Sequence, residues 1–416
     1  MRRIFILLGG LLACAASLAA EPLSQGFSDR LESRILGEKR HYSVYLPPSY
    51  QLAPTARFPV IYLIDGDYHF PYVPGLIEQL SVAGEQIPEA IVIAVGENGK
   101  AAYRREVVPA LGKGGGEAAK LREFLARELI PEIDRRYRTT SYRILLGQSL
   151  AGLFALDTLI EQPELFSAYV AISPSLWWED YALRAKAEAA FEAKSDWKAR
   201  LYLSQGNERG MGVLEFAGLL ERSAPSAPAF KFTRFENDNH GSVMIPALTW
   251  SLRQEFAGFE MTSERFRGFA GAEDFLAHYR QLKTRLGFEF LLPPGLFSNT
   301  LYAYQGEKKT ADIAHLEQGI AREFPASLPV LRLTEAELAL DAGQNAEALQ
   351  HCRAAAPARR FESHWCAARA LQALGKTAEA KQEMARARTL APALGLRQWR
   401  WNQLDADTRA LDAGAR

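Results

Sequence analysis

The sequence predicts an α/β domain, with a mostly parallel sheet in three layers, followed by an all-helical domain. From about residue 40 to residue 260, apolar β-rich runs alternate with helical stretches, as a sheet covered by helices on both faces requires. After residue 262 such runs stop and Ala, Leu, Glu and Gln dominate. Since single cores stop growing near about 250 to 300 residues, we assign residues 21–261 and 262–416 to two domains.

Two apolar runs identify buried strands of the sheet. Phe58–Ile64 and Ala90–Val95 are continuous apolar segments bounded by Pro, Gly and Asp, which is typical of strands covered on both faces. Residues 117–134 carry apolar side chains at helical spacing and follow a run of three glycines. Strands are expected at 42–46, 58–64, 90–95, 143–146, 169–172, 201–203 and 230–235, and helices at 117–134 and 150–160.

The first residues have the pattern of a signal peptide. Arg2 and Arg3 precede an apolar run, and small residues follow through Ala20. We expect cleavage after Ala19 or Ala20, so that residues 1–20 are removed and the protein is periplasmic or secreted. A lipoprotein acylated at Cys14 is the alternative, although Leu12 fits that motif poorly. No later stretch is long and apolar enough to span a membrane.

Charge and cysteine content narrow the remaining options. The formal net charge is +0, which gives no positive field for a polyanion, so nucleic acid is not an expected partner. Once the signal peptide is removed, Cys352 and Cys366 are left, both in the helical region. They form a disulfide in an oxidising compartment or remain two free thiols, and the sequence leaves both readings open.

The helical domain contains a repeat. Gly343 recurs as Gly375, and the Ala-Glu-Ala at 346–348 recurs at 378–380, both offset by 32 residues. A weaker copy around Gly306 lies 37 residues before Gly343. Tetratricopeptide repeats have a period near 34, so the pattern predicts three such helix pairs and a protein partner for them. An Ala-rich bundle without true repeats is the alternative.

Ser149 is the candidate nucleophile. It lies in Gly147-Gln148-Ser149-Leu150-Ala151-Gly152, directly after an expected strand and before an expected helix. A nucleophile elbow needs this strand-to-helix context and small residues on both sides of the serine. The motif therefore predicts an α/β-hydrolase fold with Ser149 at a strained, exposed turn.

A serine hydroxyl needs a base, and the base needs an orienting group. Of the seven histidines, two precede Ser149 and four lie in the helical domain, which leaves His240 in a polar loop after the last strand. Glu208 follows the 201–203 strand and is the first choice for the acid. Asp238 is the second choice, and a Ser and His dyad without a carboxylate also remains open.

Two backbone N–H groups are expected to form the oxyanion hole. The first is that of Leu150, and the second, from the loop after the third strand, is assigned by position to Asp67. The carboxylates of Asp65 and Asp67 lack the clustered His or Cys that would indicate a metal. No metal and no cofactor is therefore predicted.

These residues resemble the enterochelin esterase-like group of the esterase D family of α/β hydrolases. The resemblance implies hydrolysis of carboxylic esters, with Ser149 as nucleophile and His240 as base, and helical repeats are familiar beside such domains. Ala151 replaces the usual Gly, and Glu208 stands where Gly-x-x-Asp is usual. The likeness covers residues 41–50, 62–67, 128–134, the elbow, 173–178 and 239–243.

The sequence thus predicts a serine hydrolase that cleaves an ester through an acyl-enzyme, with a siderophore ester of the enterochelin type as the sharper expectation. An acyltransferase with the same nucleophile, or a scaffold acting through the helical repeats, is the alternative. Trp177 and Trp178 are candidates for an aromatic pocket, although one of them equally fits core packing. Arg105 is a candidate for a substrate charge, against the commoner solvated arginine.

Overall fold

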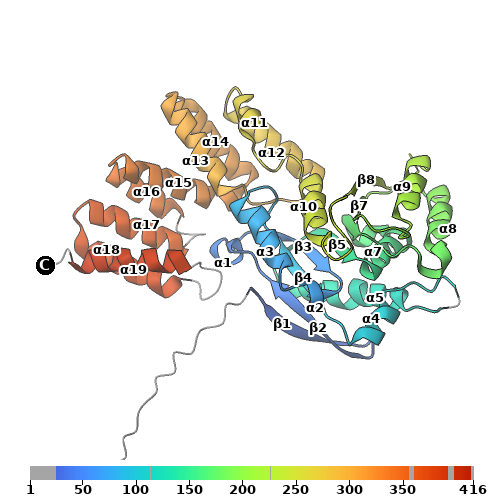
Figure 1. The fold of residues 1–416 in the computed structure, drawn as a ribbon. Coiled ribbons are helices and arrows are strands. Elements are labelled where there is room, and N and C mark those ends of the chain that lie inside the picture. The colour runs from blue at the N-terminus through green and yellow to red at the C-terminus, as the bar shows by residue number, and fades with distance from the viewer. Residues whose placement is uncertain (1–24, 113, 225, 356–359, 392–397, 414–416) are drawn as a thin grey trace, which may run out of the picture.

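The structure is a computed structural model that describes residues 25–112, 114–224, 226–355, 360–391 and 398–413. The predicted signal peptide, residues 1–20, lies outside the described residues. Within them, an α/β domain is followed by a succession of helices that extends away from one side of the sheet (Figure 1). No described helix is long and apolar enough to cross a membrane.

A single mixed sheet forms the centre of the α/β domain. Its described strands run in the order β1-β2-β4-β3-β5-β6-β7-β8, with β1, β2 and β4 pairing antiparallel and all later pairs parallel. The seven predicted strands are present, and the added edge strand β1 has the mostly exposed polar sequence that hid it. The strands are β1 Phe27–Ser33, β2 Glu38–Tyr45, β3 Phe58–Leu63, β4 Ile91–Val95, β5 Thr139–Gln148, β6 Ala168–Ile172, β7 Arg200–Gln205 and β8 Ala229–Arg234.

Helices cover both faces of the sheet (Figure 1). The continuous helix predicted over 117–134 is interrupted by a π-helical turn over Leu125–Leu129. Pro131 lacks the N–H that a regular α-helix would donate there, which accounts for the break. The helices are α1 Ser49–Leu52, α2 Gly66–His69, α3 Val73–Glu78, α4 Lys100–Glu106, α5 Ala118–Phe124, α6 Ile130–Arg136, α7 Leu150–Glu161, α8 Trp178–Ala193, α9 Val213–Arg222 and α10 Met244–Glu255.

The apolar core continues through residue 262, where the sequence places the start of the second domain. Tyr142 in β5 packs against Phe256 and Phe288, and its ring centroid lies 6.1 Å from that of Phe256 and 4.8 Å from that of Phe288. The same buried cluster includes Phe275 and Tyr279 of α12 and extends into α15. The five helices over residues 263–341, of which all but α11 contribute buried side chains, extend the core away from one face of the sheet. They are α11 Ser263–Arg267, α12 Ala272–Leu286, α13 Pro294–Gly306, α14 Thr310–Glu323 and α15 Leu328–Asp341.

The last helices carry the repeated turn. Gly343 and Gly375 have φ angles of 74° and 75° and identical hydrogen bonds 32 residues apart. The same bonds surround Lys308, at φ 55°, 35 residues before Gly343. The offset of 37 predicted from Gly306 is therefore two residues too long, because a lysine occupies the left-handed position. The helices are α16 Asn345–Ala355, α17 Arg360–Ala373, α18 Thr377–Leu390 and α19 Gln398–Ala413.

The two cysteines that the sequence left open form a disulfide. Cys352 lies in α16 and Cys366 in α17, with Cα atoms 5.6 Å apart. Both side chains are buried in an apolar cluster separate from the sheet core. The bond therefore fastens one helix pair to the next within the end of the helical region.

Truncation tests how far the core of the α/β domain extends. A chain ending at Met261 loses the cover that Phe275 and Tyr279 provide, at about 1.5–3 kcal/mol for each large buried side chain. We expect it to aggregate or to unfold without cooperativity. A chain ending at Gly343 keeps that cover and is expected to remain soluble, with a cooperative thermal transition. Size-exclusion chromatography and circular dichroism compare the two, and a stable chain ending at Met261 would contradict the continuous core.

Candidate active site

Ser149 occupies a strained turn between β5 and α7. Its φ and ψ are 58° and −120°, which a residue other than glycine seldom adopts. A Cβ on Gly147 would lie 2.2 Å from the carbonyl oxygen of Ala151, so the turn needs glycine there. The Ser149 N–H donates to the Ile172 carbonyl of neighbouring β6 at 3.0 Å. The hydroxyl is thus presented at the carboxyl edge of the parallel strands.

His240 and Glu208 meet beside this turn. His240 Nδ1 lies 3.2 Å from Glu208 Oε1, although 32 residues separate them. The Gln148 side-chain amide, next to Ser149, donates to the His240 carbonyl and joins the histidine loop to the elbow. Burial acts to raise the pKa of Glu208, but hydrogen bonding with Ser173 and His240 lowers it below its usual value. The ionised carboxylate fixes Nδ1 as the protonated nitrogen and leaves Nε2 to accept a proton.

Asp238 has a different task. Its carboxylate accepts a hydrogen bond from Ser242 Oγ at 2.9 Å, and its carbonyl oxygen accepts from the Asn207 N–H at 2.7 Å. The side chain therefore closes its own loop, as short polar side chains do near turns. Glu208, the first choice from the sequence, is the carboxylate that contacts His240.

A residue absent from the predicted site contacts the candidate nucleophile Ser149 directly. Ser175 Oγ lies 3.1 Å from Ser149 Oγ, and the Ser175 N–H donates to the Ser149 carbonyl at 3.0 Å. The hydrogen-bond partner that the structure describes for Ser149 Oγ is thus Ser175 and not His240. The signal available in the sequence was the place of Ser175 after β6, the strand next to β5.

The two expected oxyanion donors lie at the ends of adjacent strands. Leu150 is the first residue of α7, where backbone N–H groups lack helical acceptors. Asp67 lies in the first turn of α2, after β3, which pairs with β5. The Asp67 carboxylate binds His41 Nε2 and the Glu97 N–H, all at 3.0 Å. The role of the Asp67 backbone N–H in the oxyanion hole stays a prediction.

Glu97 lies close to the carboxyl groups of Asp65 and Asp67. Burial, followed by the nearby Asp65 and Asp67 carboxylates, raises the pKa of Glu97 to about 8. The phenol of Tyr103 donates to Asp65 Oδ2 at 3.3 Å. The described residues contain no group of three or more His, Cys, Asp or Glu side chains arranged to hold a metal.

The candidate substrate residues separate into exposed and engaged side chains. Trp177 is 45% exposed at the start of α8, two residues after Ser175. Trp178 packs against the hydrophobic core, with its ring centroid 6.1 Å from that of Trp177. Arg105 forms an ion pair with Glu117 at 3.1 Å. Trp177 is therefore the side chain of these three that is placed to meet a ligand.

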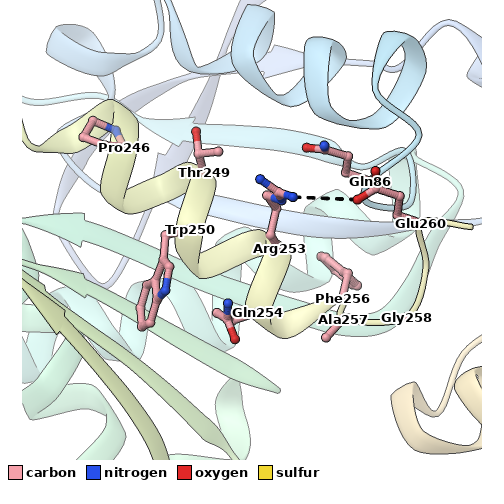
Figure 2. A pocket seen from close by; sticks show the side chains of 10 residues that line it. All are labelled: Gln86, Pro246, Thr249, Trp250, Arg253, Gln254, Phe256, Ala257, Gly258 and Glu260. Atoms are coloured by element: carbon pink, nitrogen blue, oxygen red, sulfur yellow. Dashed lines mark ion pairs between the residues drawn. The ribbon is translucent and has the colours of Figure 1, made fainter. Parts of the chain in front are cut away.

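A cavity of about 550 Å³ lies along α10 and contains none of the catalytic candidates (Figure 2). Trp250 and Gln254 of α10 are among the residues that line it, and Arg253 pairs with Glu260 at 3.8 Å. The catalytic candidates instead lie in loops at the carboxyl edge of the sheet. This cavity is accordingly separate from the candidate active site.

Comparison with known proteins gives concordant results. Residues 33–233 match the family model described as "Putative esterase". The chain is 25% identical over 252 residues to the ferri-bacillibactin esterase BesA of Bacillus subtilis, covering 52% of this chain and 85% of that relative. It is 29% identical over 173 residues to the siderophore triacetylfusarinine C esterase of Aspergillus fumigatus, covering 38% and 59%. An IroE-like serine hydrolase from Shewanella oneidensis is 28% identical with a TM-score of 0.60, covering 71% and 98%. The predicted fold class is confirmed.

Exchanging single carboxylates tests the assignment of the acid. Glu208→Gln keeps the shape but removes the charge that orients His240, and we expect kcat for an activated ester to fall roughly 10²- to 10⁴-fold. Asp238→Asn keeps a hydrogen-bond acceptor for Ser242 and is the matched control, with an expected change of less than about threefold. Steady-state kinetics at pH 7 compare the variants, and the opposite ranking would transfer the acid role to Asp238.

The raised pKa of Glu97 predicts a pH-dependent stability. The folded protein binds the Glu97 proton more tightly than the unfolded chain does. Protonated Glu97 therefore adds fully to the free energy of unfolding below the unfolded pKa, and this stabilisation is lost as pH rises through about 8. Glu97→Gln cannot ionise and should gain in melting temperature relative to wild type between pH 5 and pH 9. Differential scanning calorimetry at both values checks the sign, and an unchanged difference would mean that Glu97 is ionised throughout.

Proposed function

We propose that the protein is a serine ester hydrolase acting through an acyl-enzyme on Ser149, and the match of residues 33–233 to the esterase family model supports this. The observation that carries the proposal is the elbow itself. Ser149 has a φ of 58° at the start of α7, and the paired His240 and Glu208 stand in loops at the same edge of the sheet. A serine at such an elbow, and a histidine paired with a carboxylate at the same edge, are the groups that nucleophilic acyl transfer uses.

In the proposed mechanism, Ser149 Oγ attacks the ester carbonyl while His240 Nε2 takes its proton. The Glu208 carboxylate stabilises the imidazolium that forms. The developing oxyanion accepts hydrogen bonds from backbone N–H groups, with Leu150 as the first donor and Asp67 as the second, each worth about 3 to 4 kcal/mol of barrier. His240 then returns the proton to the departing alcohol. Water repeats the sequence on the acyl-enzyme, releases the acid and regenerates Ser149.

We propose a siderophore ester as the substrate class. One relative is named a ferri-bacillibactin esterase and another a siderophore triacetylfusarinine C esterase. Trp177 is exposed beside the elbow and offers an aromatic surface of the kind on which a catecholate ring stacks. An acyltransferase would use the same acyl-enzyme with an alcohol in place of water, so the acceptor distinguishes the two.

Export across a membrane is part of the proposal. The supporting observations are the Arg2-Arg3 start with its apolar run and the Cys352–Cys366 disulfide. Disulfides persist in oxidising compartments and are rare in the cytosol. Periplasmic or secreted location agrees with both features.

The mature protein and Ser149→Ala provide the test of mechanism. We expect wild type to hydrolyse para-nitrophenyl acetate and butyrate and to gain one fluorophosphonate adduct by intact mass. The alanine variant should show neither, because it lacks the nucleophile. Turnover of iron-free and ferric triscatecholate triesters, followed by chromatography, tests the substrate class. A folded wild-type protein with no turnover and no adduct would overturn the hydrolase proposal.

A further inference from the structure

Ser175 makes two separate contacts with the same residue. Its N–H donates to the Ser149 carbonyl at 3.0 Å, and its hydroxyl oxygen lies 3.1 Å from Ser149 Oγ. The residue is only 2% exposed, so water does not compete freely for this hydroxyl. The backbone bond sets the position of the Ser175 side chain relative to the strained turn. The hydroxyl is therefore held at a fixed place beside the nucleophile.

Ser173, at the other end of the same tripeptide, contacts the acid side of the site. It is fully buried with a φ of 41°, and its N–H donates to the Ser204 carbonyl at 2.8 Å. Its hydroxyl oxygen accepts the Gly206 N–H at 3.2 Å, and Gly206 begins the loop that carries Glu208. The tripeptide that follows β6 thus touches the nucleophile through one hydroxyl and the acid loop through the other.

The direction of the Ser175 hydrogen bond follows from the chemistry of Ser149. The Ser149 hydroxyl must give its own proton to His240 Nε2, so its oxygen is an acceptor when it reacts. Ser175 is the hydroxyl described within reach of that oxygen. It keeps its proton throughout, and no bond at Ser175 is made or broken.

We propose that Ser175 is a catalytic hydrogen-bond donor to Ser149 Oγ, which steadies the nucleophile and stabilises the negative charge that develops on its oxygen. This deepens the proposed function and rests on Ser149 being the nucleophile. Hydrogen bonds to a charged oxygen are roughly twice as strong as those to a neutral one. The Ser175 hydrogen bond therefore stabilises the transition state more than the resting enzyme. Its removal should lower the rate constant and leave substrate affinity unchanged.

Fluorophosphonate labelling separates these two quantities. We expect Ser175→Ala to lower the maximal rate of inactivation about tenfold or more and to leave the reversible inhibition constant within about twofold. Ser175→Cys keeps a side chain of similar size with a weak donor, and its maximal rate of inactivation should lie between those of wild type and Ser175→Ala. Ser251→Ala is the matched control, since it also loses a buried hydroxyl, for which the structure describes no partner, on α10. It should label at the wild-type rate.

Each outcome decides the proposal. Ser175→Ala labelling as fast as wild type, or losing only affinity, would overturn it, because either result places the hydroxyl outside the reaction. If circular dichroism shows that the alanine variant is unfolded, Ser175→Cys carries the test, and a wild-type rate for that variant overturns the proposal. A wild-type protein that takes no label at all would instead refute the nucleophilic role of Ser149.

Discussion

The left-handed turn at Ser149 is the constraint to which the rest of the site conforms. A φ of 58° is costly for serine, so the surrounding structure must hold it in place. Gly147 permits the close approach of α7, and Ile172 accepts the Ser149 N–H from the neighbouring strand. The Ser175 N–H satisfies the Ser149 carbonyl on the other side. The strain is thus balanced by contacts from β6 and the residues after it.

The parallel sheet brings the remaining groups to this turn. Because β5, β6, β7 and β8 are successive parallel neighbours, their carboxyl ends deliver Ser149, Ser175, Glu208 and His240 to one edge. Hydrogen bonds between the loops then fix their relative positions. The Asn207 N–H donates to the Asp238 carbonyl, which joins the acid loop to the histidine loop, and Gln148 joins the histidine loop to the elbow.

Chain order predicted which candidate residues would lie together, and their catalytic roles stay predictions. Ser149 was recognisable from local spacing, and His240 and Glu208 from their order after it along successive strands. Ser175 was not, because its role depends on two strand ends meeting in space and serine after a strand is common. The left-handed Lys308 was missed for a related reason, since glycine is the expected residue there and only the backbone reveals the exception.

The helices after residue 262 also bear on the catalytic side of the molecule, through α10. Arg285 of α12 donates to the carbonyls of Glu255 and Ala257 at 3.1 and 2.7 Å, at the point where α10 ends. A cation at this end donates hydrogen bonds to the last carbonyls of the helix and interacts favourably with the negative end of the helix dipole. The other end of α10 begins at Met244, four residues after His240. The helical extension caps the end of α10 and covers Tyr142. It therefore helps to hold α10 in place, and with it the histidine loop that leads into this helix. Its packing against the core of the α/β domain gives this extension a structural role of its own.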